Sequence, residues 1–369
     1  MAASKVYFTD FHCSPGVSRL DKLKRLLNQA GLDRIDFQDK MVAIKLHFGE
    51  LGNLAYLRPN YAKVVADFVR ARGGLPFLTD CNTLYIGSRK NALEHMDTAA
   101  LNGFLPATTG CHVIIADGLR GGDDVEVPVV GGEYVKTAKI GRAVMDADIV
   151  LALSHFKAHE NAGLGGALKN LGMGCGSRRG KMEMHSDGKP HVVSELCVGC
   201  GACARICVHG APQIQDGVCS IDQNRCVGCG RCLAACPKNA VQSSSKGSVQ
   251  MLNYKIAEYS KAVIDGRPSF CINMVCDVSP NCDCHAENDV AMVPDVGMFA
   301  SFDPVALDLA CAEAVNRQPV MLGSVLDKPE LREDPDHFHA AHGHTHWYDL
   351  IEHAKKIGLG SDEYEIVRI

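Results

Sequence analysis

Residues 41–48 read Met41-Val-Ala-Ile-Lys-Leu-His-Phe48, a mostly apolar run that is typical of a buried strand. A helical pattern opened by Pro59 and ended by Gly73-Gly74 follows it, and the next apolar run covers residues 75–80. Strand-like and helix-like runs continue to alternate along the chain, with further strand-like runs at 5–9, 112–117, 149–154 and 270–276. This alternation predicts an α/β domain with a mostly parallel sheet that is covered on both faces.

The composition limits the classes of partner. The 369 residues are 46% hydrophobic and carry a formal net charge of −5, so the chain has no basic field for nonspecific binding to nucleic acid or an anionic membrane. No apolar run approaches the roughly 18 residues that span a bilayer, and the first residues lack a signal-peptide pattern. We therefore expect a cytoplasmic protein with no nucleic-acid or membrane partner, whereas the oligomeric state is left open. The 18 cysteines then favour metal ligation or redox chemistry over disulfides.

Eight cysteines form two copies of one spacing, Cys-x2-Cys-x2-Cys-x3-Cys, and Pro237 follows the second copy only. Residues 191–242 thereby resemble a bacterial ferredoxin domain with two [4Fe-4S] clusters, for which this spacing is known. The resemblance implies that the last cysteine of each run serves the other cluster. One cluster would take Cys197, Cys200, Cys203 and Cys236, and the other Cys226, Cys229, Cys232 and Cys207. The alternative is a pair of zinc sites, because sets of four thiolates also suit zinc.

Polar stretches at 181–190 and 243–247 flank the cysteine-rich segment like linkers. The pattern of strands and helices resumes after them. We therefore interpret the chain as one α/β domain, residues 1–188 and 246–369, that is interrupted by a two-cluster ferredoxin domain at 189–245.

Polar residues follow several predicted strands at the ends where α/β proteins bind ligands. The candidate catalytic residues are Lys45, His47, His155, His159 and Lys169. The candidate cofactor-binding residues are Asp80, Arg89, Gly163, Gly165 and Gly166. The glycines lie in a stretch that could let backbone amides approach an anion, or could simply form a tight turn.

Several stretches together resemble the family of uncharacterised iron–sulfur-centre proteins, in which an α/β domain of unknown function carries an inserted bacterial ferredoxin. The matching stretches are Lys45–Glu50, Thr79–Tyr85, Ala167–Cys175, Cys282–Cys284 and Asp303–Asp308, and the resemblance covers nearly the whole chain. It implies the fold and the two clusters but no substrate.

A second resemblance is local. His159-x2-Ala-Gly163, followed by Gly165, Gly166 and Lys169, is similar to a segment of the nickel-pincer lactate racemase family. This resemblance implies that Lys169 would tether a cofactor and that His159 would be an acid or base. The alternative is a surface lysine and a hydrogen-bonded loop histidine.

Three further cysteines, Cys175, Cys282 and Cys284, could bind an additional metal, or could be small buried apolar residues. The α/β cleft could equally hold an organic cofactor.

We interpret the protein as an iron–sulfur redox protein and an oxidoreductase, whose clusters pass single electrons to a substrate or second cofactor in the α/β cleft. Its partner would be a redox protein or a small-molecule acceptor, in an anaerobic host. The alternatives are a non-catalytic electron carrier that docks on a reductase and a nickel-dependent, racemase-like enzyme.

Overall fold

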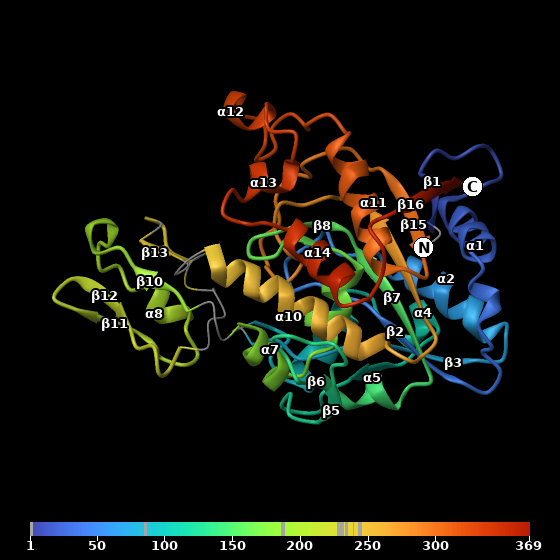
Figure 1. Cartoon of the computed structure of the whole chain (residues 1–369), viewed down its shortest axis with the longest axis horizontal. Coiled ribbons are helices and arrows are strands. Elements are labelled where there is room, and N and C mark those ends of the chain that lie inside the picture. Colours follow the sequence, from blue (N-terminus) through green and yellow to red (C-terminus); the bar gives the residue numbers. More distant parts are fainter. Residues whose placement is uncertain are drawn as a thin grey trace.

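A central sheet organises the chain. The computed structural model describes residues 3–84, 87–185, 189–226, 232, 235–238, 240–242 and 246–369. Within these residues the largest sheet has eight strands (Figure 1). Their spatial order is β16 (Tyr364–Arg368), β1 (Ser4–Asp10), β15 (Gly297–Ser301), β14 (Ser269–Val275), β7 (Ile149–His155), β2 (Met41–Lys45), β3 (Leu75–Asp80) and β4 (Val113–Ile115).

Most neighbouring strands of this sheet are parallel. Only β15 runs antiparallel to its neighbours, β1 and β14. In β2, Lys45 is paired with Ala152 of β7 and with Thr79 of β3, so these three strands end at the same edge of the sheet. The predicted α/β class with a mostly parallel sheet is therefore confirmed.

The sheet is covered on both faces, as the alternation along β7 illustrates. Val150 and Ala152 pack into one core, and Leu151 and Leu153 pack into the other, because successive side chains of a strand point to opposite faces. The first core includes residues of α6 (Ala167–Cys175), α10 (Lys246–Ile264), α11 (Pro304–Asn316) and α14 (Tyr348–Lys356). The second includes residues of α1 (Arg19–Gln29), α2 (Pro59–Arg70) and α3 (Ala92–Leu101).

Local sequence signals define several helix starts. Ser18 and Asp21 form a capping box at α1, and Pro59 is the first residue of α2. Asp303 accepts hydrogen bonds from two backbone N–H groups at the start of α11. The smaller elements of the α/β part are η1 (Leu32–Arg34), α4 (Pro106–Thr109), β5 (Asp124–Pro128), β6 (Thr137–Gly141), α5 (Arg142–Asp146), α12 (Pro329–Arg332) and α13 (His337–Ala341).

The cysteine-rich segment lies to one side of the α/β part, at the left of Figure 1. Its described elements are β10 (His191–Val192), η2 (Ser194–Leu196), α8 (Ala202–Ile206), β11 (Pro212–Gln215), β12 (Val218–Ile221) and β13 (Val241–Gln242). β10 pairs with β13 and β11 with β12, both antiparallel, and a small core of Cys203, Cys219, Cys232 and Val241 lies between them. Helices α7 (Arg178–His185) and α10 bracket the segment in sequence. That this segment is a ferredoxin domain stays a prediction.

Candidate functional site

A cavity of about 80 Å³ lies at the sheet edge where β2, β3 and β7 end. The hairpin of β8 (Lys157–His159) and β9 (Gly163–Gly165) contributes to its wall, as do α6, α7 and α10. The structure brings most of the predicted site residues of the α/β part together here. These are Lys45, His47, Asp80, Arg89, His155, His159, Gly165, Gly166, Lys169, Cys282 and Cys284.

A buried ion-pair network links the ends of β2 and β3. Nζ of Lys45 lies 3.0 Å from Oδ1 of Asp80 and donates a 2.7 Å hydrogen bond to Oδ1 of Asn170. Nε of Arg89 donates to Oε2 of Glu50 at 3.1 Å. Burial alone would raise the pKa of Asp80, but the ammonium of Lys45 and two neighbouring histidines hold this pKa below its usual range. Asp80 is thus an ionised carboxylate that fixes the cations around it.

A second buried network surrounds Asp283, the residue between Cys282 and Cys284. Its carboxylate lies 3.0 Å from Nδ1 of His155 and 3.0 Å from Nζ of Lys157. Nε2 of His155 lies 2.8 Å from the carbonyl oxygen of Cys276. Both partners of this imidazole are hydrogen-bond acceptors. His155 therefore connects Asp283 of the cysteine loop to the backbone of Cys276.

At His159, by contrast, one ring nitrogen accepts hydrogen bonds from the backbone. Its Nδ1 accepts hydrogen bonds from the backbone N–H groups of Asn161 and Ala162, both at 3.0 Å. Burial lowers the pKa of His159, although the nearby carboxylate of Glu160 opposes this. The ring is therefore neutral with its proton on Nε2. His47 follows the same rule, because its Nδ1 accepts from a backbone N–H and burial lowers its pKa well below the usual value.

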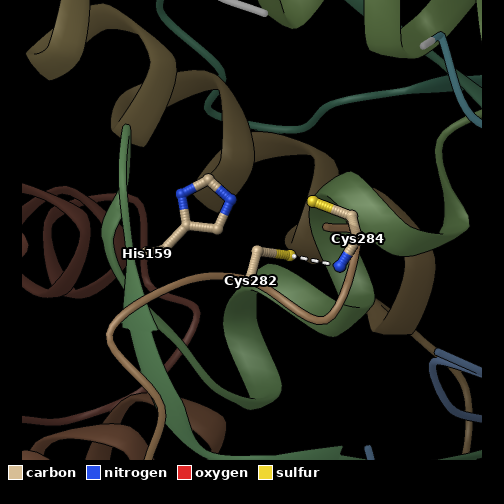
Figure 2. Close-up of side chains that lie close together, drawn as sticks. All are labelled: His159, Cys282 and Cys284. Carbon is tan, nitrogen blue, oxygen red and sulfur yellow. Dashed lines mark hydrogen bonds between the residues drawn. The ribbon is translucent and has the colours of Figure 1, made fainter. Parts of the chain in front are cut away.

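The sulfur atoms of Cys282 and Cys284 lie beside the His159 ring (Figure 2). One side-chain atom from each of the three residues falls within 4.8 Å of the others, and the backbone N–H of Cys284 donates to Sγ of Cys282 at 3.4 Å. The neighbouring Cys284 thiol, together with burial, raises the pKa of Cys282 to about 11. Nζ of Lys169 lies 3.7 Å from Sγ of Cys282. Burial would lower the pKa of Lys169, but the two sulfurs raise it, so the amine stays charged.

Two groups of residues in this region could hold a metal ion: His159, Cys282 and Cys284, and next to them Glu160, Cys284 and His285. A histidine that binds a metal usually donates a hydrogen bond from its other nitrogen. In His159 that nitrogen accepts instead, so Nε2 presents an N–H rather than a lone pair.

The third cysteine of the prediction, Cys175, does not lie beside Cys282 and Cys284 in the cavity. Its sulfur contacts the carbonyl oxygen of Asn170, and it does not line the cavity.

The predicted glycines have different roles. Gly163 has φ +83° and packs under Trp347, so it shapes the chain and does not line the cavity. Gly166 precedes α6, whose first backbone N–H groups, at Ala167 and Leu168, donate to the carboxylate of Asp308 at 2.7 and 2.9 Å. An internal carboxylate thus occupies the position where these amides were expected to bind an anion.

The cysteine-rich segment places one complete predicted set of cluster ligands around a second, smaller cavity. Cys197, Cys200 and Cys203 of the first run and Cys236 of the second all line it. Backbone N–H groups of Cys219 and Ala240 donate to Sγ of Cys197 and of Cys236, each at 3.3 Å. Hydrogen bonds of this type also occur on the sulfur atoms of iron–sulfur clusters, where they tune the potential.

The second predicted set is described only in part. Cys207, Cys226 and Cys232 lie within the described residues, and Cys232 contributes to the small core of the segment. Cys229 lies outside the described residues. This set therefore remains a prediction.

Sequence reasoning missed several residues of both sites. Lys157, Lys181 and Asn170 line the large cavity. In the cysteine-rich segment, Sγ of Cys219 lies 3.4 Å from Sγ of Cys203, although Cys219 falls outside the repeated spacing. Its place on a strand next to the first run was the available signal.

Comparisons with known proteins bear on the whole chain. The family model described as "Domain of unknown function (DUF362)" matches residues 42–313. The chain belongs to the DUF362 family. The matched range includes the large cavity's residues from β2 to Cys284 as well as the cysteine-rich segment. No curated protein matches this DUF362 chain in sequence.

Two solved structures are similar to parts of this DUF362 member. The lactate racemase apoprotein from Thermoanaerobacterium thermosaccharolyticum has 12% identity and a TM-score of 0.39, over 74% of this chain and 51% of that protein. A structural-genomics crystal structure of a protein from Thermotoga maritima has 14% identity and a TM-score of 0.35, over 79% of this chain and 56% of that protein. The chain spans about half the length of each. Within the described residues, no helix is long and apolar enough to cross a bilayer.

Proposed function

We propose that the protein is an iron–sulfur redox enzyme that acts on a substrate or second cofactor in the large cavity. Two [4Fe-4S] clusters in residues 189–245 would supply one-electron transfer. The first would be held by Cys197, Cys200, Cys203 and Cys236, and the second by Cys226, Cys229, Cys232 and Cys207. The clustering of the first four thiols around one cavity supports this part of the proposal.

One observation carries the assignment of the large cavity as the reaction site. The two helices that bracket the cysteine-rich segment both contribute to the wall of the large cavity. Helix α7 contributes His185 at its end, and α10 contributes Leu252 and Ile256. A substrate there would lie next to the elements that connect the two parts of the chain. An electron carrier without a substrate would not need a cavity lined by protonatable groups.

The side chains of this cavity can deliver the protons that accompany reduction. Nε2–H of His159 is a neutral donor, and the ammonium of Lys169 is a charged one that lies beside Cys282. The ion pairs of Lys45 with Asp80 and of Lys157 with Asp283 are buried and fix the wall around these donors. Such fixed charges position a ligand without rearrangement during the reaction.

Reoxidation of reduced protein tests the proposal. Protein purified without oxygen and reduced with dithionite would be mixed with candidate small-molecule acceptors, and the recovery of the oxidised spectrum would be timed. We expect at least one acceptor to reoxidise the protein, and K169M to slow this at least about tenfold at unchanged iron content. The matched control is K90M, because Lys90 is a half-exposed lysine that pairs with Glu94 away from the cavity. If K169M and K90M both reoxidise at the wild-type rate, the cavity is not the reaction site.

A further inference from the structure

Arg89 and Thr83 form an unusual corner of the large cavity. Both line it, both are buried, and the backbone N–H of Thr83 donates to the carbonyl oxygen of Arg89 at 3.0 Å. The side chain of Arg89 is only 1% exposed, yet among the described residues its Nη2 has no hydrogen-bond partner. Within the same part of the chain, Oγ1 of Thr83 also has none.

Unpartnered polar atoms of this kind are costly. A buried donor that makes no hydrogen bond loses its hydration without compensation, and the loss is greater when the group is charged. The rest of the guanidinium is held in place, because Nε bonds to Glu50 and Nη1 lies 3.8 Å from Oδ2 of Asp80. Nε and Nη1 are therefore held in place, and Nη2 is left as an unpartnered donor of a residue that lines the cavity, as does Thr83, whose hydroxyl can also donate.

The charge of the cavity indicates which ligand would satisfy these donors. Five lysine and arginine side chains line it, namely Lys45, Arg89, Lys157, Lys169 and Lys181. Among the described residues, the carboxylates of Asp80, Glu50 and Asp283 form ion pairs with Lys45, Arg89 and Lys157. Lys181 donates to the carbonyl oxygens of Gly174 and Gly176, and Lys169 approaches Sγ of Cys282, with the carboxylate of Glu160 close enough to favour its charged form. The wall thus presents five basic side chains, and two of them, Lys169 and Lys181, form no ion pair within the described part of the chain.

We propose that this corner binds an oxyanion, a carboxylate or phosphate group of the substrate, with Nη2 of Arg89 and Oγ1 of Thr83 as its donors. That this ligand is the substrate rests on the proposed function; that the corner binds an oxyanion does not. The reacting part of that ligand would then lie within the same cavity as Nε2–H of His159 and the thiols of Cys282 and Cys284. Positioning by a fixed guanidinium is a common way to hold such groups.

Anion binding to the whole protein tests the proposal without any need for electron transfer. Thermal unfolding and calorimetry would be run with sodium phosphate, malonate and acetate, each against sodium chloride at equal ionic strength. We expect saturable binding of at least one oxyanion. Preference for phosphate identifies a phosphorylated substrate, and preference for malonate or acetate identifies a carboxylate.

Two variants and a control make the test specific. T83V removes a hydroxyl that has no partner, so we expect it to fold at least as stably as wild type without anion, yet to bind the anion at least about tenfold more weakly. R89K keeps the positive charge but loses the planar guanidinium with its several N–H donors, and it should weaken anion binding by a similar factor. K90M should bind as wild type does. The proposal is overturned if no oxyanion binds, or if T83V and R89K bind with wild-type affinity. Anion binding without any reoxidation would instead contradict the proposed function alone.

Discussion

Nζ of Lys45 and Oδ1 of Asp80 lie 3.0 Å apart, and their side chains are only 1% and 4% exposed. The two residues are the last of β2 and of β3, so the pair joins the strand ends that border the cavity. Removing one member would leave a buried charge without its partner, which typically costs about 3–5 kcal/mol.

We therefore expect D80N to lower the free energy of unfolding by about 3–5 kcal/mol, measured by urea denaturation at pH 7. The control is D67N, because Asp67 pairs with Lys63 on the surface, where both side chains are nearly half exposed and the loss should be below about 1 kcal/mol. The folded pKa of Asp80 is below its unfolded value, so its contribution is present above about pH 4 and is lost as the pH falls. Equal losses in D80N and D67N would contradict this account of the pair.

Asp308 should give the opposite pH dependence. Burial raises its pKa to about 6, although the backbone donors of α6 and Asn273 oppose the rise. Because the folded pKa exceeds the unfolded value of about 3.9, stability is lost as the pH rises from about 4 to 6. Relative to wild type, D308N should gain about 2–3 kcal/mol over that interval and no more above it, as measured by denaturation at several pH values. The control is D33N, because Asp33 is an exposed carboxylate. A constant difference between D308N and wild type would show that the pKa of Asp308 is not raised.

Gly163 supports the hairpin that carries His159. At this position φ is +83°, and an added Cβ would lie 2.7 Å from Cβ of Trp347. G163A should therefore combine backbone strain with a steric clash and cost at least about 3 kcal/mol of stability. Gly266 has φ +72° but no described heavy atom within 4 Å of such a Cβ, so G266A should cost only about 1–2 kcal/mol. Thermal unfolding of both variants separates the cost of backbone strain from the cost of the clash with Trp347. Equal losses of stability in G163A and G266A would exclude the clash as a cause.

The thiol of Cys282 should react slowly at neutral pH. With a pKa of about 11, its thiolate fraction, and hence its rate of alkylation, should rise about tenfold per pH unit between pH 8 and 10. The ammonium of Lys169 favours the thiolate, so K169Q should slow alkylation at pH 9, while K90Q should leave it unchanged. Peptide mapping after timed alkylation measures both effects. A rate that does not depend on pH, or that K169Q leaves unaltered, would contradict this description of the two side chains.

Much of the α/β fold could be predicted from local sequence. The apolar runs of β2, β3 and β7 and the caps of α1 and α11 are signals contained in a few consecutive residues. β15 and β16 were not predicted. They are short, and β15 takes its place by antiparallel pairing between β1 and β14, which local periodicity does not encode.

The candidate site was predicted as a set of residues but not as a set of contacts. Lys45 could be singled out because it lies in a strand-like run, and Lys169 because it follows a glycine-rich stretch. The partner of Lys157 is Asp283, and the residue that occupies the start of α6 is Asp308, each more than 120 positions away. Such pairs depend on which strand ends and loops meet, and this is set by the packing of the whole sheet.

The most direct test of the central claim is iron and sulfide analysis, with electron paramagnetic resonance, of protein purified without oxygen. We predict about eight iron and eight sulfide ions per chain and a paramagnetic signal on reduction, because two [4Fe-4S] clusters are proposed. C203S should lose iron, whereas C311S, a buried cysteine of the α/β core, should keep it. Zinc in place of iron, or iron-free protein with no signal on reduction, would contradict the account.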